Sequence, residues 1–302
     1  MDTRPAPNPD PGKARKLLLI TVIAFGTVGL LVRGIPLPSA EIALFRAVIA
    51  LVVLGLYLLI SGKHRLLIEH KKQLWKFLLS GAVMAFNWIL LFEAYKHTSI
   101  ALATLAYYLA PTLMIVFGMV LLKESLTRKQ VFCFALSTLG LVLILGVSFG
   151  NSSDVKGVLL GLASAVLYAT VITINRLSGQ IDGLVRATLQ FVGASIVMVP
   201  TILLGEGFHV QSLDVSGWVS LIILGVFHTG LCYALYFISI VRLKGQQVAI
   251  LSYLDPLVAV LLSVLLLKES VTFWQLVGGI VMLAAAFFNE INPKPRIMEK
   301  RV

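Results

Sequence analysis

An aspartate followed by a proline lies in the middle of an apolar segment, where an ionisable group is costly and usually serves a function. Asp255 precedes Pro256 within the segment 246–267. Because proline has no backbone N–H, it leaves the carbonyl of Ser252 without its helical partner. An acid beside a broken helix could bind a cation, a substrate ammonium group or a proton. The alternative is that Asp255 caps local backbone groups or pairs with His228.

Two basic side chains lie inside other apolar segments. His228 lies midway along the segment 216–240, and it could exchange a proton because imidazole titrates near neutral pH. A hydrogen-bonded packing residue is the alternative. Arg46 lies near the start of the segment 41–61, where it could bind a carboxylate or gate the mouth of a pathway. Its alternative roles are an ion pair, with Glu41 nearby, or a side chain that reaches towards the membrane interface.

Aromatic, hydroxyl and amide side chains accompany these ionisable groups. Aromatic faces can hold apolar groups or, by cation–π contact, an ammonium group. Ordinary helix packing is the alternative for each of them. The candidate binding residues are Asn87, Trp88, Thr104, Tyr107, Tyr108, Tyr168, Asn175, His228, Tyr233, Tyr236, Ser252, Tyr253 and Asp255, with Arg46, Pro111 and Pro256 as structural or gating residues.

The composition places these residues inside a membrane. Of the 302 residues, 58% are hydrophobic and 13% are charged, whereas a soluble domain has about 25% charged residues. Apolar runs of about 20 residues recur, which is the length that crosses a hydrocarbon core of about 30 Å. We therefore expect an all-α transmembrane protein, a ten-helix bundle. The predicted spans are 16–33, 41–61, 74–95, 99–122, 128–148, 156–176, 184–204, 216–240, 246–267 and 272–290.

Basic residues are divided unequally between the two sides of this predicted bundle. With ten spans, one side receives both termini and 20 basic residues, and the other side receives 4. Because short positively charged loops stay in the cytoplasm, we expect both termini to be cytoplasmic, in the inner membrane of a bacterial cell. The net charge of +11 then reflects topology rather than nucleic-acid binding. Residues 1–15 are expected to be a disordered tail and 292–302 a second tail.

An internal repeat divides the chain into two halves. The sequence Leu-Leu-Lys-Glu-Ser occurs at 121–125 and again at 266–270, and the same offset of 145 residues carries Pro111 onto Pro256. Each half contains five spans, an odd number, so the second half must enter the membrane from the opposite side. Inverted repeats are typical of secondary transporters, although a duplicated scaffold without transport is the alternative. The predicted five-helix repeats are residues 16–149 and 150–291.

Three segments resemble the signature of EamA-type transporters of the drug/metabolite transporter superfamily. They are LAYYLAPTLMIVFGMVLLKES, LSYLDPLVAVLLSVLLLKES and FRAVIA. The resemblance covers about residues 16–290 and implies a central cavity, with the fifth and tenth spans at the periphery. It also implies export of amino acids and related metabolites, while relatives carry choline, nucleotide sugars, riboflavin or drugs. This sequence has Lys-Glu where many members have Gly-Glu.

We therefore expect a secondary transporter that exports a small amphipathic metabolite, an amino acid or amine, by alternating access. Its expected partners are the small-molecule substrate and the lipid bilayer, with protons as a candidate coupling ion and a homodimer as a candidate assembly. The alternatives are an importer or facilitator of choline, a nucleoside, riboflavin or a drug, and a non-transporting assembly subunit. No catalytic residue, metal or cofactor is expected, because the sequence has neither a Gly-x-Ser-x-Gly elbow nor a His-Glu-x-x-His motif.

Overall fold

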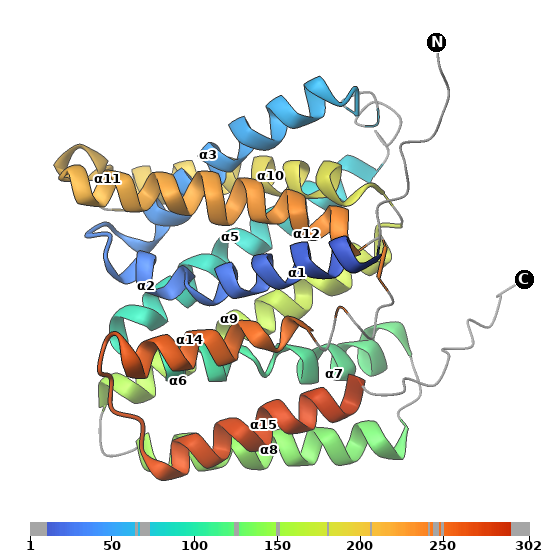
Figure 1. The fold of residues 1–302 in the computed structure, drawn as a ribbon, viewed down its shortest axis with the longest axis vertical. Coiled ribbons are helices and arrows are strands. Elements are labelled where there is room, and N and C mark those ends of the chain that lie inside the picture. Colours follow the sequence, from blue (N-terminus) through green and yellow to red (C-terminus); the bar gives the residue numbers. More distant parts are fainter. Residues whose placement is uncertain are drawn as a thin grey trace, which may run out of the picture.

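The protein is a bundle of helices that lie side by side (Figure 1). No strand occurs in the part of the chain that the computed structural model describes. The first helix begins and the last helix ends at the same end of the bundle (Figure 1). The described residues are 11–63, 66, 73–123, 127–148, 152–179, 181–205, 207–240, 242–243, 248 and 251–290.

The helices of the first half are short where the chain breaks and long elsewhere. They are α1 (Pro11–Gly26), α2 (Val28–Arg33), α3 (Ser39–Ile60), α5 (Leu74–His97), α6 (Ile100–Tyr107), α7 (Ala110–Leu122) and α8 (Arg128–Ser148). The second half contains α9 (Ser152–Leu177), α10 (Gly183–Leu204), the 3₁₀ turn η2 (Val210–Ser212), α11 (Val215–Ile222), the π-helix η3 (Ile223–Leu231), α12 (Cys232–Ile240), α14 (Leu254–Leu265) and α15 (Phe273–Glu290).

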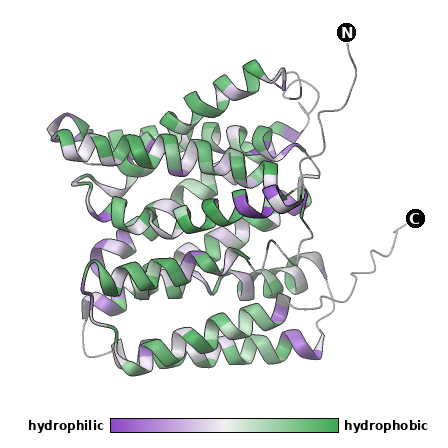
Figure 2. Ribbon diagram, viewed as in Figure 1, coloured by the Kyte–Doolittle hydropathy of each residue, from purple (hydrophilic) through white to green (hydrophobic). Residues whose placement is uncertain are grey.

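Length and apolar composition make most of these helices suitable for a bilayer. Within the described residues, 7 helical segments are long and apolar enough to cross a membrane, and the shorter helices α14 and α15 are apolar as well. Hydrophobic residues dominate along the helices, and hydrophilic ones gather towards their ends (Figure 2). The predicted class, a helical multi-pass membrane protein, is therefore confirmed. The count of ten spans stays a prediction.

Several membrane-length segments are interrupted near their middle. Thr27 separates α1 from α2, Tyr108 begins the turn between α6 and α7, and Tyr253 occupies a turn directly before α14. Pro111 and Pro256 each lie in the first turn of the helix that follows the break. Proline is tolerated there because the first N–H groups of a helix have no intrahelical partner. The sequence prediction of a broken helix before Pro256 thus agrees with the structure.

The repeat seen in the sequence is also present in the backbone. Lys123 and Lys268 are the non-glycine residues with positive φ among those described, at 55° and 53°. They occupy equivalent positions of the two repeats, after α7 and after α14. Helix α7 ends at one end of the bundle and α14 at the other (Figure 1). The two matching segments therefore run in opposite directions.

The same kind of capping begins α8 and α15. The backbone N–H of Thr127 donates to Oε1 of Gln130 at 2.9 Å, and that of Thr272 donates to Oε1 of Gln275 at 2.9 Å. In return, the threonine hydroxyls accept from the backbone N–H groups of the glutamines at 3.2 and 3.3 Å. Each pair forms a reciprocal capping box, which satisfies two helix-terminal donors.

Helices α8 and α15 lie together at one edge of the bundle (Figure 1), where the family resemblance implies the fifth and tenth spans. Their backbones touch at two glycines. A Cβ atom on Gly140 would lie 2.6 Å from the carbonyl oxygen of Gly278, and one on Gly278 would lie 2.5 Å from that of Gly140. Since real Cβ atoms do not approach so closely, glycine is required at this crossing.

Candidate functional site

The helix interruptions of the two halves meet in the interior of the bundle. The hydroxyl of Thr27, between α1 and α2, lies 2.8 Å from Nε2 of His228 in the π-helix η3. A Cβ atom on Gly26 would lie 2.7 Å from the carbonyl oxygen of Asp255. The break in the first span therefore lies against the backbone of Asp255 and the ring of His228. Local π-helical geometry is frequent at functional sites.

Asp255 is bound by a tyrosine from the opposite half. The hydroxyl of Tyr108 donates to Oδ2 of Asp255 at 2.7 Å and lies 3.5 Å from the carbonyl oxygen of Ser252. That carbonyl is the one that Pro256 deprives of its helical partner. His228 does not replace this contact, because its ring nitrogens face Thr27 and the backbone. The first repeat has Ala110 at the position that matches Asp255.

An aromatic cluster of two groups of rings lies near this acid, which contacts it through Tyr108. The ring centroid of Tyr107 lies 6.0 Å from that of Tyr108 and 5.5 Å from that of Tyr168. Tyr233 contacts Phe191 at 5.4 Å and Phe25 at 5.5 Å. One group of the aromatic cluster is Tyr107, Tyr108 and Tyr168. The other group is Phe25, Trp88, Phe191, Tyr233, Tyr236 and Phe237.

The polar members of the cluster keep part of their surface accessible. Asp255 and the cluster tyrosines are half-buried, although each contacts side chains from other helices. Partly accessible groups that face one another from several helices are suited to binding a small solute between them. Phe25, Phe191 and Phe237 were not among the predicted site residues. Their signal was weak because phenylalanine is common throughout this apolar chain.

Arg46 lies within the bundle without a carboxylate partner. Its side chain is 4% exposed, and its guanidinium carbon lies 4.2 Å from the ring centroid of Trp88 and 5.3 Å from that of Phe92. Its Nε donates to the hydroxyl of Thr229 at 3.1 Å. Among the described residues it forms no ion pair. The suggested pairing with Glu41 is therefore absent.

Glu41 instead fastens the turn η2 to the start of α3. Its carboxylate is fully buried and accepts hydrogen bonds from the backbone N–H groups of His209 at 2.8 Å and Val210 at 3.0 Å. The ring nitrogen Nδ1 of His209 lies 2.9 Å from the same carboxylate. These bonds satisfy a buried acid and leave Arg46 to its aromatic contacts.

Two predicted amide residues join helices instead of bordering the aromatic cluster. Asn87 donates to the carbonyl and the hydroxyl of Ser164 at 2.7 and 2.8 Å, which fixes α5 against α9. Asn175 accepts from the hydroxyl of Ser80 at 3.0 Å and from the amide of Gln190 at 3.2 Å. Both residues therefore have interhelical partners within the protein.

Three further predicted residues have other contacts or surroundings. Tyr253 packs on Phe287 of α15, with ring centroids 5.9 Å apart. Thr104 is buried, and Pro111 borders a separate pocket of about 210 Å³. Among the predicted residues, the structure thus brings Tyr107, Tyr108 and Tyr168 together with Ser252 and Asp255. It places Trp88, Tyr233 and Tyr236 in the second group of the aromatic cluster. His228 contacts the break in the first span.

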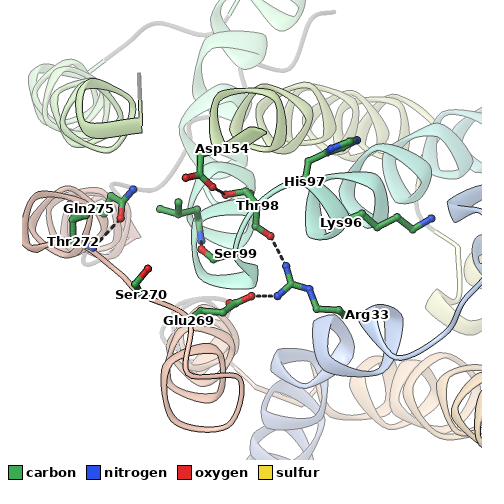
Figure 3. A pocket seen from close by; sticks show the side chains of 11 residues that line it. Arg33, Lys96, His97, Thr98, Ser99, Asp154, Glu269, Ser270, Thr272 and Gln275 are labelled. Carbon is green, nitrogen blue, oxygen red and sulfur yellow. Dashed lines mark hydrogen bonds and ion pairs between the residues drawn. The ribbon is translucent and has the colours of Figure 1, made fainter. Parts of the chain in front are cut away.

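An ion pair between the two halves lies at one end of the bundle (Figure 3). Arg33 contacts Glu269, and its Nη2 donates to the carbonyls of Tyr95 at 2.7 Å and Thr98 at 2.5 Å. Glu269 also accepts from the backbone N–H of Ile100 at 3.0 Å. The sequence identifies the basic loop residues as topological signals, but it does not reveal this ion pair because the two partners are distant in the chain.

A polar pocket of about 410 Å³ lies beside this ion pair (Figure 3). Thr98 donates to Asp154 at 2.5 Å within it. The described residues contain no group of three or more histidine, cysteine, aspartate or glutamate residues that could hold a metal ion. The lining residues are Arg33, Lys96, His97, Thr98, Ser99, Leu102, Asp154, Glu269, Ser270, Thr272 and Gln275.

Comparison with known families agrees with the two-part architecture. The model of the EamA-like transporter family matches residues 13–146 and, separately, residues 155–290. The chain belongs to the EamA-like transporter family. As an EamA protein it is a membrane transporter of small solutes and not an enzyme.

Individual relatives of this EamA protein come from bacteria and animals. It is 30% identical over 271 residues to "Uncharacterized transporter YxxF" of Bacillus subtilis (strain 168), which covers 88% of this chain and 86% of that protein. It is 28% identical over 182 residues to "Probable amino-acid metabolite efflux pump" of Salmonella typhimurium, covering 57% and 61%. Solute carrier family 35 member G1 of Mus musculus is 23% identical over 292 residues, covering 92% and 78%.

A solved protein illustrates the fold of this EamA chain. The crystal structure superposes with a TM-score of 0.63 and covers 92% of this chain and 97% of the other. The two sequences are 21% identical, so this likeness concerns the fold alone.

Proposed function

We propose that this protein is a secondary transporter that exports a small amphipathic metabolite with an ammonium group, an amino acid or amine, by alternating access. The observation that carries the proposal is the meeting of helix interruptions around Asp255. Interrupted helices at mid-membrane form the binding sites of many secondary transporters, because their free backbone groups and flanking side chains can bind a solute. Here the break before α14 faces the break between α1 and α2 through Gly26.

The chemistry around Asp255 suits an ammonium group. A carboxylate attracts the cation, and tyrosine faces contact it through cation–π interactions. The hydroxyl of Tyr108 donates to the carboxylate at 2.7 Å, and Tyr107 and Tyr168, which continue this group of rings, are half-buried. The likeness to a relative described as a probable amino-acid metabolite efflux pump supports an outward direction for this substrate class.

The proposed topology is a bundle of ten spans arranged as two inverted repeats, with both termini in the cytoplasm of a bacterial cell. The opposite directions of α7 and α14 (Figure 1) and the matched lysines Lys123 and Lys268 support the inversion. The unequal basic residues of the loops support the orientation. The repeat boundaries at 149 and 150, and a homodimer, stay predictions.

Proton coupling is proposed at the same place. Asp255 lies at the interruption before α14 and His228 in the π-helix η3. The backbone carbonyl of Asp255 and the ring of His228 lie against the segment formed by Gly26 and Thr27. Intramembrane acids and histidines form proton relays in transporters. A proton or an ammonium group can occupy the carboxylate, but not both at once.

The test is transport into proteoliposomes with radiolabelled leucine and phenethylamine, measured with and without a pH gradient. We expect accumulation by the wild type to depend on the pH gradient. We expect accumulation by Asp255→Asn not to depend on it. The matched control is Glu93→Gln, which changes a carboxylate in a pair with Lys96 at 3.6 Å near the end of α5 and should transport normally. Equal transport by wild type and Asp255→Asn, unaffected by the gradient, would contradict both the site and the coupling.

A further inference from the structure

We propose that Arg46 binds a carboxylate of the transported solute, so that the site selects zwitterions over simple amines. The proposal rests on the proposed function and makes it more specific. Asp255 would bind the ammonium group and Arg46 the carboxylate of the same molecule. Arg46 is then a specificity-determining residue.

A charged arginine at this depth requires stabilisation. Arg46 is the eighth residue of α3, about 10 Å along the helix from its first residue. It is 4% exposed, and a buried charge without a partner is costly. Its ring contacts with Trp88 and Phe92, at 4.2 and 5.3 Å, compensate in part by cation–π attraction.

The bonding capacity of Arg46 is mostly unused by the described residues. Nε donates to Thr229 at 3.1 Å, whereas Nη1 and Nη2 donate to none of the residues that the structure describes. Neither amino group is among the fully buried polar atoms that lack a hydrogen-bond partner, so both keep some accessible surface. A guanidinium with two free amino groups is suited to bidentate binding of a carboxylate.

Contacts of neighbouring residues bring Arg46 and Asp255 to the same part of the bundle. Arg46 donates to Thr229 of η3, and the preceding residue of η3, His228, lies 2.8 Å from the hydroxyl of Thr27. The backbone carbonyl of Asp255 lies against the residue before Thr27. The cation and the anion do not form an ion pair with each other. Two unpaired groups of opposite charge near one helix interruption can bind the two charged ends of one molecule.

This arrangement discriminates by charge as well as by shape. A simple amine would satisfy Asp255 and leave Arg46 without an anion, and a simple acid would leave Asp255 without a cation. A zwitterion satisfies both groups at once, and unpaired buried groups are what make discrimination strong. We therefore expect an amino acid to bind about tenfold or more tightly than its decarboxylated amine.

The experiment uses purified full-length protein and matched ligand sets. One set is phenylalanine, phenethylamine and 3-phenylpropionate, and a second is leucine, 3-methylbutylamine and 4-methylpentanoate. Ligand-induced melting shifts and competition against transport give the relative affinities. The wild type should prefer the amino acid in at least one set. Arg46→Gln should bind the amine as before and lose the preference for the amino acid.

Arg186→Gln is the matched control, because this arginine also lies over a ring, at 5.9 Å from the Phe77 centroid, but on α10. It should keep the wild-type preference.

If Arg46→Gln does not fold, Arg46→Lys keeps the charge without the planar fork and should weaken the preference. An unchanged preference in an Arg46 variant, or equal loss of amine and amino acid in a well-folded one, would overturn the role of Arg46. A wild type that transports amines as well as amino acids overturns this inference alone, whereas one that transports neither overturns the proposed function too.

Discussion

Tyr108 donates a 2.7 Å hydrogen bond to Asp255, and this bond joins helix interruptions in opposite halves of the chain. Tyr108 belongs to the turn between α6 and α7, and Asp255 to the first turn of α14. The bond therefore couples the candidate binding carboxylate to the position of the other half. Any movement that separates the two halves at this level must break or replace it.

We predict that Tyr108→Phe lowers transport about tenfold while the protein stays folded. The ring remains in the aromatic cluster, but the half-buried carboxylate of Asp255 loses a donor, which costs about 1 kcal/mol or more. Transport rate and melting temperature check this prediction. Tyr57→Phe is the control, since Tyr57 is 37% exposed on α3 and its change should leave both values unaltered. Wild-type transport by Tyr108→Phe would show that the bond has no role in the cycle.

The crossing of α8 and α15 predicts a position-specific loss of stability. Gly140→Ala places a methyl group 2.6 Å from the carbonyl of Gly278, so the helices must separate, at a cost of about 1–3 kcal/mol. A lower melting temperature in detergent is the expected result. Gly55→Ala adds the same group where nothing lies within 4 Å and should preserve or raise stability. Equal melting temperatures of the two variants would contradict the tight crossing.

The ion pair between Arg33 and Glu269 lies at one end of the bundle. Breaking this pair should open that end. Ser99 lines the adjacent pocket, and its replacement by cysteine gives a probe for a membrane-impermeant maleimide applied to intact cells. We expect Glu269→Gln to increase the labelling rate of Ser99→Cys several-fold. The native Cys133 and Cys232 are both buried.

Glu93→Gln is the control for this experiment, because it removes a carboxylate that pairs with Lys96 and His97 within α5. It should not alter the labelling of Ser99→Cys. Identical labelling in Glu269→Gln and in its parent would mean that this ion pair does not hold the end closed. Labelling only after permeabilisation would contradict the proposed orientation.

The pair of Lys63 and Asp182 predicts a pH-dependent contribution to stability. Partial burial acts to raise the pKa of Asp182, but hydrogen bonds from Lys63 at 2.6 Å and from the backbone N–H groups of Leu184 and Val185 outweigh it, so the pKa is lowered. At acid pH the unfolded chain therefore binds more protons than the folded protein does. The stabilisation is present above the ordinary aspartate pKa of about 3.9 and is lost as pH falls through the lower folded pKa.

Asp182→Asn should therefore melt below the wild type at pH 7, and this difference should shrink in the acid range. The effect is expected to be below about 1 kcal/mol, because partly exposed pairs are screened by solvent. Asp214→Asn is the comparison, as Asp214 caps α11 through Gly217 at 2.8 Å and lacks an ion pair among the described residues. A difference between wild type and Asp182→Asn that does not change with pH would contradict the ion-pair contribution.

Local features of the chain were predictable from sequence because they depend on neighbouring residues. Apolar runs set the helices, and the prolines Pro111 and Pro256 set where two of them break. The offset between matching turns predicted the repeat, and Lys123 and Lys268 carry it into the backbone. Two residues of the first matching turn, Glu124 and Ser125, lie outside the described part of the structure.

Contacts between distant residues were less accessible from sequence. The pairing of Thr27 with His228 depends on how each helix is rotated about its axis, which one sequence does not reveal. The same uncertainty explains why Asn87 was predicted to border a pocket and instead bonds to Ser164. The ion pair of Arg33 required knowledge of which loops meet at one end.

The two repeats differ at the position of Asp255, where the first repeat has Ala110. A single carboxylate can exchange one proton for one ammonium group, so the proposed cycle would have a one-to-one stoichiometry. Because a zwitterion carries no net charge, that exchange moves one positive charge across the membrane in each cycle and responds to the membrane potential. One pH unit corresponds to about 1.4 kcal/mol, so each unit of pH difference alone would sustain about a tenfold ratio of substrate concentrations.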